Sequence, residues 1–374
     1  MDGRTEPAAQ PLHALDLSLE DLTALLREMG EPAYRARQVY RWLYVSLAEG
    51  FEAMTDLPKA LRARLAERLV LSRLTPLARA RSANRQAEKV LFGLPDGETV
   101  EAVLMRYRHR LTACISSQVG CPVGCPFCAT GQSGFSRNLT AGEMVEQVLF
   151  FERAARRGGT LRRASAAEPA HQLTNVVLMG MGEPLLNYEA VLAAIRRLAD
   201  PRGFGFSPRR VTVSTVGVVP GILRLAEEDL PVRLAVSLHA ADDDLRDRLV
   251  PMNRRYPLAA LMEACRRYVE KTGRRVSFEY ALMEGVNDGV EHAEQLVGLL
   301  SGLPCHVNLI PLNPTAECPY RGSARPQVLA FARALRERGV PVSVRLRRGL
   351  DIEAGCGQLR RRLQGEVPQA GALL

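Results

Sequence analysis

The sequence predicts an α/β fold in which a partial (β/α)6-type barrel follows a small N-terminal helical domain and a connecting β-hairpin. Three observations favour this fold. Helical periodicity dominates residues 12–75, a period of two replaces it between Lys89 and Tyr107, and short β-rich runs alternate with helical stretches after residue 110. Strands that alternate with helices form a parallel sheet, and six or seven such units favour an open or partial barrel.

The N-terminal helices, expected within residues 1–78, are predicted from capping and apolar spacing. Ser18 stands three residues before Asp21, as in a helix N-cap, and precedes a periodic apolar run that Gly30 ends. Two further segments each place apolar side chains on one helical face: Val39, Trp42 and Leu43 in one, and Leu57, Leu61 and Leu65 in the other.

Residues 79–110 are expected to form a linker and a β-hairpin. The run "KVLFGLPDGETVEAVLMRY" alternates apolar and polar residues on both sides of Pro95, Asp96 and Gly97. These three residues are typical of a turn, because proline presets one dihedral angle and glycine adopts left-handed conformations.

The barrel is expected to span residues 111–357 and to leave a basic tail at 358–374. Thr140 and Glu143 have the spacing of a capping box and predict one of its amphipathic helices. Residues 158–170 have the composition of a surface insertion. The strand candidates are 112–117, 175–180, 211–216, 233–240, 276–283, 306–312 and 342–348.

Composition predicts a cytoplasmic protein with a polyanionic partner. The chain of 374 residues is 47% hydrophobic, yet it has no apolar run long enough to span a membrane and no secretory signal, so we expect no membrane association. Its net charge is +9. Arginines cluster at 155–157, 161–163, 207–210, 344–348 and 360–362. Together these clusters favour a nucleic acid as the partner.

Small and polar residues recur where the predicted strands end. They include "CISS", "MGMGEP", "STVG", "SLHA" and "PLNP". Reactive residues of β/α barrels gather at the carboxyl ends of strands, so these segments are expected to meet at one mouth.

Three cysteines follow the first of these strands in "CPVGCPFCATG". Cys121, Cys125 and Cys128 would be thiols or metal ligands in a reducing compartment. With Cys114 as a fourth ligand they would form a structural zinc site, which usually takes two separated pairs of ligands. As three ligands of a four-iron cluster they would leave one iron open to bind another molecule. Both interpretations remain possible from the spacing alone.

The motifs together resemble a known family. CxxxCxxC after the first strand of a β/α array is similar to the radical S-adenosylmethionine (SAM) superfamily. The segments "CISSQVGCPVGCPFCATGQSGFSRNLTAGE", "MGMGEPLLNY", "VTVSTVGVVPGI", "AVSLHA", "HVNLIPLNP" and "DIEAGCGQL" resemble the RlmN/Cfr family of rRNA adenine methyltransferases, over a region that runs to about residue 364.

This resemblance implies one 4Fe-4S cluster and two molecules of SAM per turnover. Cys121, Cys125 and Cys128 match the cluster ligands. The positions that match SAM-binding residues are Gly182, Glu183, Ser214, Ser237, Leu238, His239 and Asn313.

The resemblance also implies three catalytic residues. Cys356, in the glycine-flanked loop "AGCGQ", matches the cysteine that becomes S-methylated, and Cys114 matches its thiol partner in a transient disulfide. Glu101 matches the proposed proton acceptor. Cys265 and Cys305 are expected to be core residues instead.

The implied reaction is methylation of carbon-2 of an adenosine in the peptidyl-transferase region of 23S rRNA, and of an adenosine next to the tRNA anticodon. The N-terminal helices would help to hold the RNA. An electron-donor protein such as flavodoxin or ferredoxin would be a further partner of a monomeric enzyme. Three alternatives remain: a Cfr-like enzyme acting on carbon-8, a radical SAM enzyme with an unrelated substrate, and a zinc-stabilised RNA-binding protein without catalysis.

Overall fold

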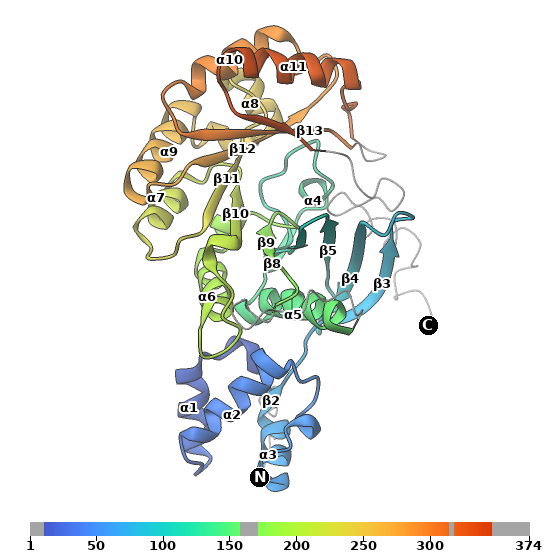
Figure 1. Ribbon diagram of the computed structural model, residues 1–374, viewed down its shortest axis with the longest axis vertical. Helices are drawn as coiled ribbons and strands as arrows, with labels where there is room; N and C mark the ends of the chain where they lie inside the picture. The colour runs from blue at the N-terminus through green and yellow to red at the C-terminus, as the bar shows by residue number, and fades with distance from the viewer. Residues whose placement is uncertain (1–10, 158–170, 314–317, 346–374) are drawn as a thin grey trace, which may run out of the picture.

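A ten-stranded sheet forms the centre of the protein. The computed structural model describes residues 11–157, 171–313 and 318–345 (Figure 1). Seven strands of the sheet are parallel and adjacent in chain order, which confirms the predicted partial barrel. They are β6 (Arg110–Cys114), β9 (Asn175–Leu178), β10 (Val211–Thr215), β11 (Arg233–Ser237), β12 (Val276–Leu282), β13 (Cys305–Pro311) and β14 (Val342–Val344). All seven strand candidates therefore overlap a strand.

The predicted hairpin is present, and it belongs to a larger antiparallel extension of the same sheet. β4 (Ala87–Gly93) and β5 (Thr99–Tyr107) pair around a turn in which Gly97 has a φ of 82°. β5 also pairs with β6, and β3 (Thr75–Arg81) pairs with β4 as the outer strand. β3 was not predicted, because this edge strand is mostly exposed and lacks an alternating apolar pattern.

The N-terminal helices lie at one end of the elongated molecule (Figure 1). The Ser18 capping box is formed: Ser18 Oγ accepts from Asp21 N at 3.0 Å, and Asp21 accepts from Ser18 N at 2.9 Å. Leu57, Leu61 and Leu65 are buried, as predicted. The elements are β1 (Leu12–His13), η1 (Ala14–Asp16), α1 (Leu19–Glu28), α2 (Tyr34–Arg41), η2 (Trp42–Ser46), η3 (Phe51–Ala53), α3 (Lys59–Arg68) and β2 (Leu69–Val70).

Helices connect successive parallel strands and cover the outside of the sheet (Figure 1). Thr140 and Glu143 form the predicted capping box, and the following helix buries Met144, Val145 and Val148. No helix in the described ranges is long and apolar enough to cross a membrane. The helices are α5 (Ala141–Arg157), α6 (Tyr188–Ala199), α7 (Val219–Glu227), α8 (Asp243–Leu249), α9 (Leu258–Thr272), α10 (Val290–Leu300) and α11 (Arg325–Glu337), with 3-10 turns η4 (Pro184–Leu186), η5 (Pro208–Arg210) and η6 (Pro251–Arg254).

One row of paired residues defines a common face across six strands. The row runs through Lys89, Val103, Cys114, Val177, Thr212 and Arg233. Side chains directly opposite each other in a sheet point to the same face, and residues two apart in a strand share it. Glu101, Cys114, Ser214 and Ser237 therefore lie on the same side of the sheet, which we call the inner face.

A buried carboxylate joins the N-terminal region to the barrel. Glu146, on α5, accepts hydrogen bonds from Arg73 N at 2.9 Å and Leu74 N at 3.3 Å, and from the Ser72 hydroxyl. His13 Nε2 lies 3.4 Å from the same side chain. Because the carboxylate is only 2% exposed, these donors replace the water that it loses on folding.

We expect Glu146→Gln to destabilise the protein. The amide has only one acceptor oxygen, and its NH2 group replaces the other oxygen with a donor that faces backbone N–H donors. We therefore expect the free energy of unfolding to fall by about 2–4 kcal/mol. The midpoint of urea unfolding measures this loss. Glu263→Gln, at an exposed carboxylate on α9, is the control and should change the midpoint little. Equal midpoints for the two variants would contradict the conclusion that the Glu146 carboxylate stabilises the contact between the N-terminal region and the barrel.

Candidate active site

The three clustered cysteines lie in a loop with a tightly fixed backbone. The loop connects β7 (Gln118–Gly120) to the short helix α4 (Ala129–Gln132), and β7 pairs with β8 (Phe135–Asn138). Gly120 has a φ of 75°, and a Cβ at this position would lie 2.0 Å from the Gly134 oxygen. At Gly131 a Cβ would lie 2.9 Å from the Cys125 nitrogen. Both glycines are therefore required for the loop to pack as it does.

The thiols of this loop lie in apolar surroundings. Cys125 is buried in a cluster with Val123, Leu245 and Met283, and Cys121 and Cys128 pack against that cluster. Burial raises the pKa of the Cys121 thiol to about 12, and it raises the pKa of Cys125 well above its usual range, with the other two thiols contributing to the Cys125 shift. Three thiolates here would be desolvated and mutually repulsive, so a cationic metal group is needed to stabilise them. This donor set fits an iron–sulfur cluster.

The arrangement does not match a single metal ion. Within the described ranges, no three His, Cys, Asp or Glu side chains are placed to hold one ion. Tetrahedral zinc at about 2.3 Å from each sulfur requires sulfur atoms only about 3.8 Å apart. A cubane cluster binds each thiolate on a different iron and so takes sulfurs that stand further apart. Three thiols on one loop suit a cluster that binds each of them through a different iron.

Gly182 and Glu183 follow β9 and contact the beginning of the cysteine segment. Gly182 has a φ of 106°, and a Cβ there would lie 2.6 Å from Gln118 Cβ. The Glu183 carboxylate accepts from Val216 N at 2.8 Å and from Leu185 N at 3.1 Å, and burial raises its pKa to about 7. Glu183 therefore joins the loops after β9 and β10. Its expected contact with the amino group of SAM remains a prediction.

The residues at the end of β11 pack directly against the cysteine loop. His239 has a φ of 63°, its ring lies 4.9 Å from the Phe127 ring, and its Nδ1 accepts from Ala281 N at 3.0 Å. Burial, with the nearby Arg246 cation, lowers the pKa of His239 to about 3. The ring is therefore neutral, with its proton on Nε2. Ser237 and Leu238 precede His239, and Ser214 lies on the inner face of the neighbouring strand β10.

Arg246, which the sequence analysis missed, stabilises these strand ends. This side chain of α8 is 1% exposed, and it donates to Leu238 O at 3.1 Å and to Val216 O at 2.6 Å. Burial lowers its pKa to about 10. A signal was available, because Arg246 stands between Leu245 and Leu249, on the face of the helix that is otherwise apolar.

Glu101 and Cys114 lie close together on the inner face. Cys114 pairs with Val103, two residues from Glu101, and the Ser116 hydroxyl donates to Glu101 O at 2.6 Å. Sequence analysis missed the partner of Glu101: Lys89 Nζ lies 2.9 Å from its carboxylate, and Lys89 is completely buried. Each charge offsets the cost of burying the other.

Asn313 and Cys356 are the remaining expected site residues. Asn313 is half-buried and follows β13 by two residues, at the same edge of the sheet as the other strand ends. Cys356 lies outside the described residues. The expected core positions of Cys265 and Cys305 are confirmed, since both are buried.

Comparisons with known proteins agree with the motifs. Residues 115–297 match the family model of the radical SAM superfamily, and residues 13–71 match the ribosomal RNA large subunit methyltransferase N-terminal domain. The chain is 49% identical to the probable dual-specificity RNA methyltransferase RlmN of Roseiflexus castenholzii, over 92% of this chain and 94% of that protein. The corresponding protein of Moorella thermoacetica is 50% identical, over 91% and 95%.

A solved structure is also similar over almost its whole length. The crystal structure of a radical SAM methyltransferase from Sphaerobacter thermophilus has a TM-score of 0.88 and 52% identity, and the match covers 93% of this chain and 99% of that chain.

Arg246→Lys tests the role of the buried guanidinium at the strand ends. A lysine keeps the charge, but its single ammonium cannot reproduce the forked hydrogen bonds to two strand ends. We expect a lower thermal midpoint and at least tenfold weaker SAM binding, measured calorimetrically on anaerobic protein. Arg248→Lys on the same helix is the control. An Arg246→Lys protein with unchanged SAM affinity would show that this side chain does not shape the site.

Proposed function

Because this chain belongs to the RlmN family of radical SAM RNA methyltransferases, we propose that it methylates carbon-2 of an adenosine in the peptidyl-transferase region of 23S rRNA, and of an adenosine next to the tRNA anticodon. The observation that carries this proposal is identity of about one half to RlmN proteins across more than nine tenths of the chain. The inner-face positions of Glu101 and Cys114 support it.

The cofactors are a 4Fe-4S cluster and SAM. Cys121, Cys125 and Cys128 would hold the cluster, and one iron without a protein ligand would take SAM. When bound, the cluster and SAM would supply one-electron cleavage of the sulfonium, and so a radical able to remove hydrogen from a methyl group. The proposed SAM contacts are Gly182, Glu183, Ser214, Ser237, Leu238, His239 and Asn313.

Neutral His239 and paired Glu183 suit a site that binds a charged cofactor. His239 cannot add a third positive charge beside the sulfonium and ammonium groups, because its pKa is about 3. Glu183 is held between two strand ends, and an approaching ammonium would favour its ionised form. A charge-assisted hydrogen bond there would be stronger than the same bond in water.

Two cysteines are needed because carbon-2 of adenine has no lone pair with which to attack a sulfonium. We propose that Cys356 carries the methyl group and delivers its carbon to the adenine ring. Cys114 would then attack the sulfur of Cys356 and release the methylated RNA, leaving a disulfide that a reductant must reopen. Cys114 is 7% exposed, so little water competes with this step.

Glu101 is the proposed acceptor of the proton that leaves carbon-2. The Lys89 ammonium stabilises the buried carboxylate charge of Glu101. The Ser116 hydroxyl donates to the backbone oxygen of Glu101, which connects this strand to the segment that carries Cys114. Base and thiol would therefore act on the same side of the sheet.

The RNA would be held by residues 1–78, proposed as an accessory domain, and by arginine-rich stretches that include Arg209 and Arg210. The linker and hairpin at 79–110, the barrel at 111–357 and the tail at 358–374 complete the proposed organisation. A flavodoxin or ferredoxin as electron donor, a monomeric state and a cytoplasmic location also stay predictions.

Replacing Cys356 by alanine should lower RNA methylation by about a thousandfold or more, because the variant lacks the thiol proposed to carry the methyl group to the adenine. SAM cleavage by the reduced protein should persist. Mass spectrometry of rRNA and tRNA measures methylation and its position, which also separates carbon-2 from carbon-8. Cys305→Ala, at a core thiol, should retain activity. If Cys356→Ala still completes the enzyme's full reaction, and not only SAM cleavage, the chain would be a radical SAM enzyme with an unrelated substrate.

Removing one cluster ligand should remove the chromophore. Anaerobically purified protein should be brown, with a broad band near ~400 nm from the cluster, and Cys121→Ala should lose most of it. Iron and zinc analysis of the same samples decides between the two metal hypotheses. A colourless wild-type protein with one bound zinc would support the non-catalytic RNA-binding alternative.

A further inference from the structure

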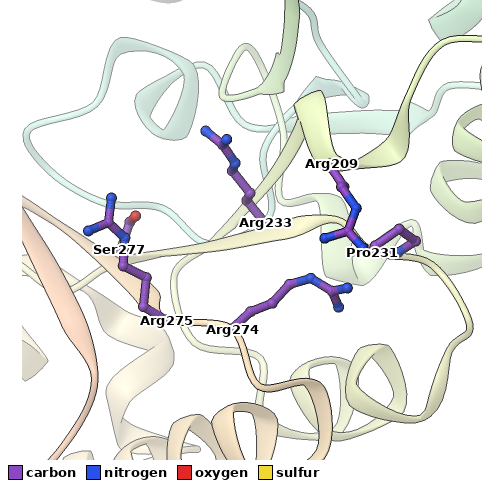
Figure 2. A pocket seen from close by; sticks show the side chains of 6 residues that line it. All are labelled: Arg209, Pro231, Arg233, Arg274, Arg275 and Ser277. Carbon is purple, nitrogen blue, oxygen red and sulfur yellow. The ribbon is translucent and has the colours of Figure 1, made fainter.

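Four arginines line a pocket at the amino ends of three neighbouring strands, away from the cysteine loop. Figure 2 shows Arg209 coming from the turn before β10, Arg233 from the beginning of β11, and Arg274 and Arg275 from the residues just before β12. Pro231 and Ser277 complete the lining of a cavity of ≈ 290 Å³. We call it the arginine pocket.

The strand register places this pocket on the inner face. Arg233 is paired with Thr212, and Ser277 with Ala235. On the same strands Ser237 and Glu279 follow on the same face, toward the carboxyl ends. β12 has seven residues, which at roughly 3.3 Å each separates its two ends by about 20 Å. The arginine pocket and the candidate active site are therefore at opposite ends of one barrel interior.

The charges of the pocket are uncompensated within the described residues. Its lining contains four guanidinium groups and no carboxylate, and none of the four takes part in an ion pair there. Other exposed arginines do find partners: Arg202 lies 2.9 Å from Asp200, and Arg224 lies 2.6 Å from Glu189. Cations gathered around one cavity repel each other, so an anion in the cavity would stabilise the arrangement.

We propose that the arginine pocket is a phosphate-binding site. Guanidinium groups present forked donors that match the geometry of phosphate oxygens, and phosphate is the anion for which such clusters are best suited. The Ser277 hydroxyl adds a neutral donor at the wall. The cavity holds a phosphate group together with water molecules, but it is small for a whole nucleotide chain.

The phosphate could come from the RNA backbone or from a small phosphorylated molecule. Both sources share the chemistry that the pocket recognises. Three of the arginines, Arg209, Arg233 and Arg275, are exposed, which leaves the pocket accessible to a polymer that crosses its rim. The proposal of a phosphate-binding site does not rest on the proposed function. The proposal that RNA supplies the phosphate does rest on it.

Thermal unfolding of the full chain in inorganic phosphate tests the site. We expect 10 mM phosphate to raise the midpoint by roughly 2–4 °C above sodium chloride of the same ionic strength and pH. The double variant Arg233→Gln and Arg275→Gln should lose this shift. The matched control, Arg267→Gln with Arg333→Gln, removes the same charge from exposed positions on α9 and α11 and should keep it.

The source is decided by binding of an unmodified tRNA transcript at several salt concentrations. If the pocket takes a backbone phosphate, the pocket variant should show a slope of log K against log salt that is smaller by about 0.7–0.9 than that of the control variant. An unchanged slope together with a lost phosphate shift assigns the pocket to a free phosphorylated molecule.

Two results would overturn the proposal: a wild-type midpoint that phosphate raises no more than chloride does, or a pocket variant that keeps the full shift. Absence of methyltransferase activity would affect neither measurement, so failure of the proposed function is distinguishable from failure of the site.

Discussion

The mouth of the barrel depends on buried polar side chains that bind the backbone where the parallel strands end. A strand that stops leaves carbonyl and N–H groups without ladder partners, and burying them unsatisfied costs free energy. Arg246 satisfies carbonyls after β10 and β11, and Asn287 donates to the oxygens of His239 and Ala281. Glu183 accepts from two further N–H groups. These hydrogen bonds hold the loops that carry the candidate site residues against the ends of the strands.

Much of the fold could be predicted because its elements carry local signals. The seven parallel strands are short apolar runs between helices, and the capping boxes at Ser18 and Thr140 are visible as residue pairs three positions apart. The cysteine loop is equally local. Eight positions contain all three thiols, although their spacing alone leaves both a zinc site and an iron–sulfur cluster possible. For β3 no such signal exists, since an exposed edge strand needs no apolar face.

The rest of the site arises from contacts between distant segments. The role of Arg246 appears only when α8 packs behind the ends of two strands, and the arginine pocket joins residues that are up to 68 positions apart (209 to 277). Lys89 and Glu101 are an intermediate case. The hairpin turn at residues 95–97 fixes which residues face each other, so their proximity could have been derived from the register of β4 and β5. A pair such as Lys89 and Glu101 can be predicted from the sequence only after the strands and their register have been predicted.

The central sheet does not close into a ring among the described strands: β14 and β3 are its two ends, and neither pairs with the other. A closed barrel would accept only ligands that fit through its rim. The open side between these two described strands would let a folded polymer lie against the sheet, insert a single base, and leave by the same route. Access for a bulky substrate would then follow from the order of the strands.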